Sequence, residues 1–380
     1  MEIKGIFGLG SVRRAAPNLV IIFSVAGLTV LGLIVLFSAT HGIHADPYAI
    51  IRKQAVWLLI ALAAGAVAAW VDWERMRFLA WPIAGLTAGL LVLVLIEGIG
   101  VSVNGARRWL DLGLMRMQVS DFAKIAFVFV LAHYLAANQR RVRSFRSGFC
   151  LPCAIIAAVF FLILLEPDFG TAFLVGLIGG AMLFLAGVRL VYLVPSSLLG
   201  IGICAVAVVC DPVRLKRITS FLNVEANKAD GAYQLWQGIL AFGAGGLRGV
   251  GLGNGRQQNA FLPEAHTDFI FSVIGEELGF FFTAGVVGLF LLVFTVGVWN
   301  LRRAPDMFQY LLVAGALLLI SVQALLNLGV VTGCLPTKGL SLPFLSYGGS
   351  NLVCMFILVG IVLNGFRRWS RPYNLEPFKI

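Results

Sequence analysis

Long hydrophobic stretches, separated by short polar connections, run along almost the entire chain. A transmembrane helix needs about 20 consecutive apolar residues, and ten of these stretches approach or exceed that length. They predict spans at 18–40, 54–71, 78–97, 118–137, 149–165, 170–187, 190–210, 268–297, 307–330 and 350–366. The first stretch is too long for the hydrophobic region of a cleaved signal peptide, so we expect it to remain as a span. The pattern therefore predicts an all-α polytopic membrane protein.

The polar segments between the predicted spans show no sign of a soluble domain. We expect a single integral membrane domain over 1–380, with tails at 1–17 and 367–380. The largest polar segment is the loop 211–267, between the seventh and eighth spans. It contains Tyr233 and Trp236, residue types that favour the membrane interface, so we expect part of it to lie along the membrane surface.

Composition supports this picture and narrows the function classes. The 380 residues are 59% hydrophobic and 12% charged, whereas soluble domains average about 25% charged residues. The formal net charge of +11 comes from basic residues in the loops between spans, without a continuous basic stripe. We therefore expect no nucleic-acid partner.

Lysine and arginine also indicate the orientation in the membrane. If the N-terminus is cytoplasmic, the inside segments hold sixteen of these residues and the short outside loops hold six. Cytoplasmic loops carry the excess of positive charge, so both termini are expected in the cytoplasm. The loop 211–267 then lies on the outer side.

The stretch 245–279 brings ionisable groups to the start of the eighth span. Six glycines among residues 245–255 disfavour a helix, which predicts a flexible loop. Glu264, His266 and Asp268 follow within five residues, directly before an apolar run. Ionisable groups at a membrane boundary indicate function, although acids also stabilise a helix N-terminus. Glu277, nine residues after Asp268, faces the opposite side of the helix, so we expect it to pack against another span.

Two further polar groups interrupt the predicted spans. Asp121 and Lys124 are three residues apart and share a helix face, so they could form a site or simply neutralise each other. Asp168 lies in the segment 166–170, where a proline and a glycine break the hydrophobic pattern. That segment could be a plain turn or part of a polar cavity.

The last long connection, 327–351, carries Lys338, Ser346 and Tyr347 and is predicted on the same outer side as 211–267. The outer loop 98–117 adds Arg107 and Arg108. Polar groups from several loops thus converge at the outer ends of the spans, which predicts a site at the outer leaflet. Motifs for ATP hydrolysis, zinc proteolysis and serine hydrolysis are absent from the sequence.

The motifs carry a resemblance to a known family. They are NGARRWLDLG at 104–113, Q-x-S-x-F-x-K at 118–124, EPDFGTA at 166–172, the stretch 245–279 with LPEAHTDFIF, and PTKGLSLPFLSYGGS at 336–350. In this order they cover nearly the whole chain, which resembles the SEDS proteins (shape, elongation, division and sporulation). The LPTKGL version of the last motif looks more like the FtsW division branch than the RodA elongation branch.

The resemblance implies polymerisation of lipid II by a peptidoglycan glycosyltransferase in the bacterial inner membrane, at the division septum for the FtsW branch. It also implies three kinds of partner: a class B penicillin-binding protein, other division proteins and membrane lipid. The family's essential acid corresponds to Asp268, and its cavity residues to Lys124, Asp121 and Asp168. The family usually has glutamate at the position of Asp121, which leaves the role of that side chain less certain.

The chemistry can be developed from these residues as a hypothesis. Asp268 would act as the general base, with Glu264 or His266 orienting it, and Ser346 and Tyr347 would contact substrate. Four cations are candidates to hold a diphosphate: Lys124, Lys338, Arg107 and Arg108. A divalent cation (Mg or Mn) could take part, but no dedicated set of metal ligands is visible, so no cofactor is assigned.

Two other function classes remain open at this stage. A transporter could flip lipid II across the membrane, but it would need polar residues through the full membrane depth. A non-enzymatic scaffold would not need the buried Asp268 or Lys124. The sequence does not say which partner, source organism or stem peptide is involved, or whether the protein acts alone.

Overall fold

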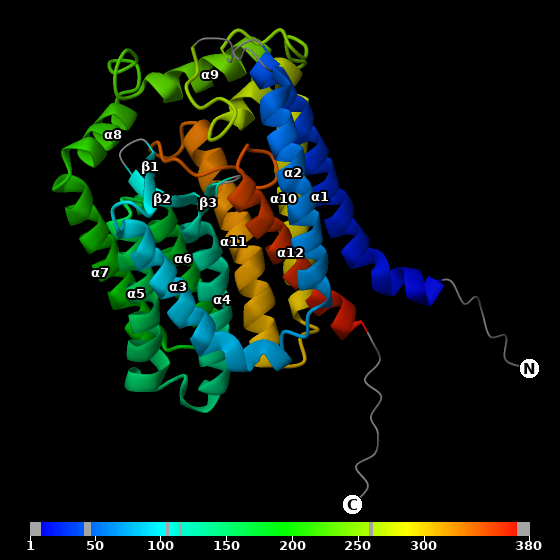
Figure 1. The fold of residues 1–380 in the computed structure, drawn as a ribbon, viewed down its shortest axis with the longest axis vertical. Coiled ribbons are helices and arrows are strands. Elements are labelled where there is room, and N and C mark those ends of the chain that lie inside the picture. The colour runs from blue at the N-terminus through cyan, green and yellow to red at the C-terminus, as the bar shows by residue number, and fades with distance from the viewer. Residues whose placement is uncertain are drawn as a thin grey trace, which may run out of the picture.

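The computed structural model describes residues 9–41, 47–103, 106–111, 113, 116–257 and 261–370. Asn104, residues 258–260 of the predicted loop 211–267, and residues 1–8 and 371–380 of the predicted tails lie outside the described residues. Within them, long helices form a bundle capped at one end by shorter elements (Figure 1). The fold class predicted from the sequence, an all-α polytopic membrane protein, is confirmed.

Ten long helices correspond one by one to the ten predicted spans. They are α1 (Leu9–His41), α2 (Pro47–Trp70), α3 (Ala80–Leu95), α4 (Val119–Ala137), α5 (Leu151–Leu165), α6 (Phe169–Leu185), α7 (Leu190–Val209), α10 (Ile270–Leu301), α11 (Met307–Val331) and α12 (Gly349–Trp369). Among the described residues, nine segments are long and apolar enough to cross a membrane, and the remaining α6 is shorter. Short helical turns at η1 (Arg75–Leu79), η2 (Gln139–Arg141) and η3 (Phe145–Cys150) connect neighbouring spans.

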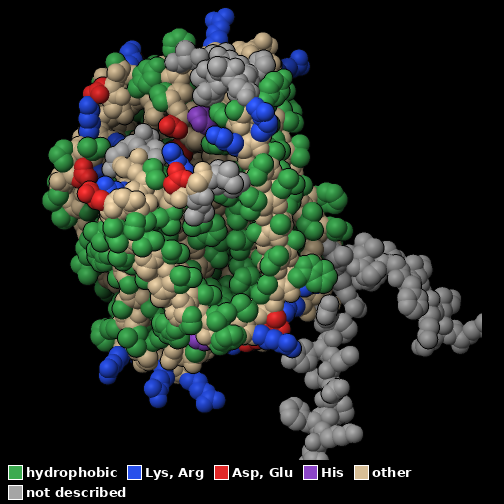
Figure 2. All heavy atoms as spheres, in the orientation of Figure 1, with side chains coloured by type: hydrophobic (Ala, Val, Ile, Leu, Met, Phe, Trp, Pro, Cys, Tyr) green, Lys and Arg blue, Asp and Glu red, His purple; other side chains and the backbone are tan. Residues whose placement is uncertain are grey.

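The centre of the bundle is formed by α4, α11 and α12. In these helices 72%, 67% and 83% of the most apolar window is buried, against 6% in α7. The outer helices therefore turn most of their side chains toward lipid, and Figure 2 shows the resulting hydrophobic belt between two charged ends. Buried polar residues on the central helices are consequently held by protein.

A small antiparallel sheet covers the start of α4. Its strands are β1 (Gly100–Val103), β2 (Ala106–Asp111) and β3 (Arg116–Gln118), in that order, with Trp109 opposite Gln118. Hydrophobic periodicity did not predict these strands, because each has only three to six residues. Strand β3 ends where α4 begins. The sheet therefore holds β2 close to the start of α4.

The predicted loop 211–267 contains two helices, α8 (Pro212–Leu222) and α9 (Tyr233–Gly245), at the same end as the sheet (Figure 1). Asp211 caps α8 by accepting from the backbone N–H groups of Val213 and Arg214. In α9, Leu235 and Ala241 are fully buried, and the helix packs against α10. The described part of the loop thus covers the end of the bundle that also carries the sheet.

The glycine-rich segment after α9 is fastened to α10, which differs from the flexible loop expected from its composition. Glu276 accepts hydrogen bonds from the backbone N–H groups of Arg256 and Gln257. Glu277 accepts from the N–H of Gly253 and from the Ser38 hydroxyl of α1, as expected for a residue packed against another span. A Cβ atom at Gly249 would lie 2.1 Å from the Glu277 carbonyl oxygen. The glycines therefore permit close backbone packing.

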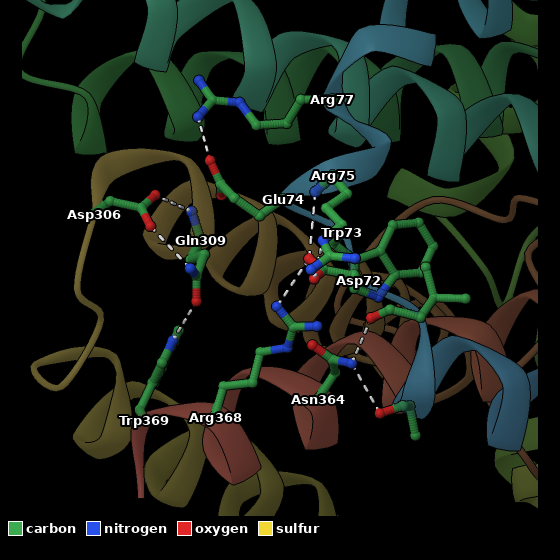
Figure 3. Close-up of polar contacts among 12 residues, drawn as sticks. Asp72, Trp73, Glu74, Arg75, Arg77, Asp306, Gln309, Asn364, Arg368 and Trp369 are labelled. Atoms are coloured by element: carbon green, nitrogen blue, oxygen red, sulfur yellow. Dashed lines mark hydrogen bonds and ion pairs between the residues drawn. The ribbon is translucent and has the colours of Figure 1, made fainter. Parts of the chain in front are cut away.

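At the opposite end of the bundle, polar side chains tie α2, α11 and α12 together (Figure 3). Asn364 donates to the carbonyl oxygens of Ala69 and Val71, both at 2.8 Å. Arg368 pairs with Asp72 at 2.9 Å and lowers the pKa of that carboxyl. These contacts lock the helix ends on the side away from the converging outer loops.

Candidate active site

Asp268 lies in the turn just before α10, held from below by α11. The Asn327 side-chain amide donates to the Asp268 carbonyl oxygen at 2.8 Å and to the Leu340 carbonyl oxygen at 2.6 Å. One buried amide thus holds the Asp268 turn beside the segment around Leu340. A Cβ atom added to Gly339 would lie 2.9 Å from Asp268 Oδ2, so the carboxylate rests directly on this glycine.

The other two ionisable residues of the turn take different positions. Glu264 is exposed, with a φ of 55°, and its carboxylate accepts from the Thr267 hydroxyl at 2.9 Å. His266 is half-buried; its ring centre lies 5.8 Å from that of Tyr347, and its carbonyl oxygen accepts from the Tyr347 N–H. The turn therefore exposes one acid and packs the histidine against the 336–350 segment.

The surroundings of Asp268 favour its neutral form. Burial raises the pKa of Asp268 to about 7, with further contributions from the Glu264 and Asp168 carboxylates, while Arg108 and Arg217 oppose the rise. Near neutral pH the carboxyl group can therefore both accept and release a proton, as a general base requires.

Asp168 stands between α5 and α6 and links the start of α6 to the sheet. It caps α6, accepting from the Thr171 N–H at 3.0 Å and the Thr171 hydroxyl at 2.9 Å. Arg108 of β2 lies 3.6 Å from Oδ2, the oxygen that also accepts from the Thr171 hydroxyl, and it donates to the carbonyl oxygens of Glu166 and Pro167. The segment 166–170 is therefore more than a plain turn, because it seats an arginine next to a buried carboxylate.

The two arginines of β2 are separated by the alternation of the strand. Arg107 donates to the Leu95 carbonyl oxygen and pairs with Glu97 at 3.1 Å, away from Asp168. Of these two arginines, both among the four cations predicted to hold a diphosphate, only Arg108 is thus brought to the Asp168 carboxylate.

Asp121 and Lys124 form a buried ion pair at 2.8 Å inside the bundle. Lys124 also donates to Gln323 of α11 at 3.1 Å, and the Gln323 amide donates to the Ser341 carbonyl oxygen and to Asn351. The two side chains therefore neutralise each other, which is one of the two possibilities that the sequence left open. Through Gln323 the pair also reaches the segment that lies beside Asp268.

Ser346 stabilises the turn 342–346 through two hydrogen bonds with Leu342. Its hydroxyl accepts from the Leu342 N–H at 2.8 Å, and its own N–H donates to the Leu342 carbonyl oxygen. Because the side chain is buried, its contacts support the shape of the loop. Tyr347, by contrast, lies next to His266.

Sequence reasoning missed three residues of this site. Gln323 and Asn327 lie four residues apart on one face of α11, and amides at that spacing in an apolar helix were the available signal. Glu166 is fully buried, and neither carboxyl oxygen has a hydrogen-bond partner among the described residues. Burial, together with nearby Asp168, raises the pKa of Glu166 to about 8.

Lys338 rests on the aromatic rings of Phe169 and Phe173, above the start of α6. Burial lowers the pKa of Lys338 to about 8. No cluster of three or more His, Cys, Asp or Glu side chains suited to a metal ion occurs within the described part of the chain.

Known proteins match this chain over nearly its full length. A family model for cell cycle proteins, named for FtsW, RodA and SpoVE, matches residues 18–368. The probable peptidoglycan glycosyltransferase FtsW of Trichlorobacter lovleyi is 39% identical over 356 residues, covering 93% of each chain. Stage V sporulation protein E of Bacillus subtilis is 37% identical and covers 94% of this chain and 99% of its own.

Two solved structures share the fold. A chain from a peptidoglycan synthase complex that coordinates polymerization and crosslinking matches with a TM-score of 0.75 at 28% identity, covering 93% of this chain and 98% of that one. The rod shape determining protein RodA of Thermus thermophilus matches with a TM-score of 0.69 at 28% identity, covering 93% and 97%.

Proposed function

We propose a function from the premise that this chain belongs to the FtsW, RodA and SpoVE family of cell cycle proteins. The proposed activity is that of a peptidoglycan glycosyltransferase, as its FtsW relatives are named. Its substrate would be lipid II, polymerised into glycan strands at the outer face of the inner membrane. The observation that carries this proposal is a single carboxyl group, Asp268, with a pKa of about 7, at the end of the membrane-embedded bundle that carries the sheet and α9.

The proposed step is a direct displacement. The acceptor's 4-hydroxyl oxygen attacks the anomeric carbon of the donor, and the bond from that carbon to the polyprenyl diphosphate breaks. The hydroxyl proton passes to Asp268, and the electron pair of the broken bond leaves with the diphosphate. One displacement inverts the anomeric centre, which converts the α-linked donor into a β-linked strand.

The contacts around Asp268 support its role as general base. A base must lie within hydrogen-bond reach of the proton it removes and must have a pKa near the working pH. Asn327 fixes the backbone of the Asp268 turn, and Gly339 leaves the carboxylate partly open. Glu264 and His266, in the same turn, are proposed to orient the base and the acceptor sugar.

The other polar groups would form the walls of the substrate site. Arg108 and Asp168 join the sheet to α6 beside the base. The buried Asp121–Lys124 pair and Tyr347 complete the proposed contacts with the sugar. We propose that Arg107 and Ser346 act indirectly, through β2 and through the loop 342–346, because their side chains are engaged within the protein.

The chain is proposed to work as one domain over 1–380, with both termini in the cytoplasm. The bias of lysine and arginine toward those segments supports this orientation. The similarity to a chain of a peptidoglycan synthase complex supports a penicillin-binding protein as partner. A septal role with other division proteins is supported by the FtsW names of the relatives, and an elongation role like that of RodA is the alternative.

A second candidate function is flipping of lipid II. The buried chain from Asp121 and Lys124 to Gln323 favours it, because polar groups within the bundle are what a transporter would use.

An assay in detergent separates the two functions, since flipping has no meaning without a bilayer. The purified chain with its class B partner, whose transpeptidase is blocked, would receive lipid II, and glycan length would be read on a gel. The proposal predicts polymer. Absence of polymer, together with lipid II crossing liposomes that contain the protein, would replace it by the transporter.

A further inference from the structure

Two phenylalanines at the start of α6 form an aromatic pair at the edge of the site. Phe169 and Phe173 are four residues apart on one helix face, with ring centres 6.3 Å apart and planes inclined by 16°. The Lys338 ammonium lies 4.0 Å from the centre of the Phe173 ring and 4.7 Å from that of Phe169. The Arg214 guanidinium of α8 lies 5.2 Å from the Phe169 ring centre. Two cations from distant segments thus share one aromatic surface.

Lys338 differs from the other cations of the site in its partners. Lys124 pairs with Asp121, Arg108 with Asp168, and Arg107 with Glu97. Over the described residues, the Lys338 ammonium has neither a hydrogen-bond acceptor nor a carboxylate in ion-pair contact; it has only the two rings. A ring attracts a cation through its quadrupole but does not neutralise its charge. The positive charge of Lys338 therefore stays available to an anion.

Arg214 is held against the Phe169 ring by contacts with Asp211 and α7. Its Nε atom pairs with Asp211 at 3.0 Å, and one terminal nitrogen donates to the Ala207 carbonyl oxygen at 3.4 Å. These contacts fix the guanidinium against Phe169. Guanidinium and ammonium groups placed together are the usual protein partners of phosphate oxygens.

We propose that Lys338 binds the diphosphate of the polyprenyl-linked donor, with Arg214, whose charge is already paired with Asp211, as a weaker second contact, and that Phe169 and Phe173 are the residues that position these two cations. This inference rests on the proposed function and assigns its leaving-group site. As the anomeric carbon–oxygen bond breaks, negative charge grows on the departing diphosphate oxygen. A desolvated, unneutralised cation stabilises that charge more strongly than one already paired with a carboxylate.

The aromatic pair also links the two halves of the reaction centre. Phe169 directly follows Asp168, which pairs with Arg108 and adds to the raised pKa of Asp268. The rings thus hold the leaving-group cations next to the segment that acts on the base. Burial lowers the pKa of Lys338 to about 8, so the ammonium is still mainly protonated at neutral pH.

The test is direct binding of farnesyl diphosphate, a short polyprenyl diphosphate, to the purified full chain in detergent. All variants carry Asp268→Ala as well, so that no reaction can occur. Lys338→Met and Phe173→Leu are expected to raise the Kd about tenfold, because a desolvated cation–aromatic contact or a charged phosphate contact has that order of effect. Phe173→Tyr keeps the ring and should bind as tightly as the parent.

Phe184→Leu is the matched control, since it is the same change on the same helix at an exposed position far from Lys338. It should leave the Kd unchanged. Thermal unfolding of each variant shows whether the protein is folded. An unchanged Kd in folded Lys338→Met, or an equal loss in Phe173→Leu and Phe184→Leu, would overturn the proposal.

The outcome is separable from that of the proposed function. Binding that depends on Lys338, in a protein that makes no polymer from lipid II, would retain the diphosphate site and remove the glycosyltransferase. Polymer formation with a Kd indifferent to Lys338 would retain the enzyme and remove this site.

Discussion

The side-chain amide of Asn327 holds the backbone carbonyl of Asp268 at 2.8 Å, across the junction of α11 and the turn that precedes α10. The same amide nitrogen donates to the Leu340 carbonyl oxygen. A single buried residue therefore sets the distance between the proposed base and the segment that carries Gly339 and Lys338. The proposed active site depends on this support as much as on the carboxylate.

Replacing Asn327 by leucine should impair catalysis beyond its effect on stability. Two buried carbonyl oxygens would lose their donor, which costs roughly 1–3 kcal/mol for an unsatisfied buried group. The polymerisation rate of the folded protein should fall about tenfold or more, because the base would lose its fixed position. Rate and thermal unfolding are both measured.

Asn364→Leu provides the control, because Asn364 also donates to two carbonyl oxygens at 2.8 Å, at the other end of the bundle (Figure 3). It should lower stability similarly and leave the rate of the folded enzyme unchanged. Equal rate losses in both variants would show that Asn327 acts through general stability alone.

Gly339→Ala should selectively damage the site. The new methyl group would lie 2.9 Å from Asp268 Oδ2, which is too close for a carbon–oxygen contact. The carboxylate must then move, and we expect about a tenfold or greater loss of rate with little change in expression. Gly285→Ala, in α10 with nothing within 4 Å of the added Cβ, should keep wild-type activity. Full activity of Gly339→Ala would mean that the position of this carboxylate does not matter.

The polymerisation rate should depend on pH in a bell shape. The pKa of Asp268, about 7, requires kcat/KM to rise as the carboxyl loses its proton and to level off above that pH. The pKa of Lys338, about 8, predicts a fall at higher pH as the ammonium is lost. Lys338→Arg should move the alkaline limb to higher pH. A profile that is flat between pH 5 and 9 would contradict both assignments.

Asp268 should also make the fold less stable at higher pH. Its pKa in the folded protein lies above the ordinary value of 3.8, so the neutral form is favoured on folding. That contribution is complete below about pH 4 and is lost as the pH rises through about 7. Asp268→Asn should therefore unfold at a higher temperature than the wild type at pH 8, with a smaller difference at pH 4. If Asp268→Asn unfolded at a lower temperature than the wild type at pH 8, the folded protein would be shown to stabilise the ionised carboxylate.

Glu166 and Asp168 should respond differently to amide substitution. Glu166 is buried without a hydrogen-bond partner among the described residues and has a pKa of about 8, so it is mainly neutral at pH 7. Glu166→Gln should keep the activity at pH 7 and should reduce the loss of stability above pH 8. Asp168→Asn removes the charge paired with Arg108 and should lower activity about tenfold or more. Strong inactivation by Glu166→Gln would show that this carboxyl works in its ionised form.

The helices of this fold could be predicted from the sequence because the membrane demands long apolar segments. Each predicted span has its helix, and α6 begins at Phe169, directly after the capping residue Asp168, and ends at Leu185, two residues before the predicted end. The sheet β1–β3 could not be predicted, because its brief strands are set by pairing across the loop and not by periodicity. The glycine-rich segment was expected to be flexible. Buried Glu276 and Glu277 bind its backbone, and nothing in the local composition indicates that contact.

Several charged residues of the candidate site stood out in the sequence, but the contacts that support them did not. Asp268, Asp168 and Arg108 stood out as charges at span ends, and the structure brings them into one electrostatic environment. The supports from Asn327 and Gln323 were not predicted, because the spacing of two amides in an apolar helix does not indicate which groups they contact. The opposite directions of Arg107 and Arg108 likewise depend on the register of a strand that the sequence did not indicate.

The most direct test of the account is single-turnover polymerisation by wild type, Asp268→Asn and Asp306→Asn, each with its class B partner and lipid II. Asp306, which caps α11 at the other end of the bundle, is the matched carboxylate before a span. We predict a loss of about 10²–10⁴ in rate for Asp268→Asn, as expected for removal of a general base, and a wild-type rate for Asp306→Asn. Wild-type polymerisation by a folded Asp268→Asn protein would contradict the central claim.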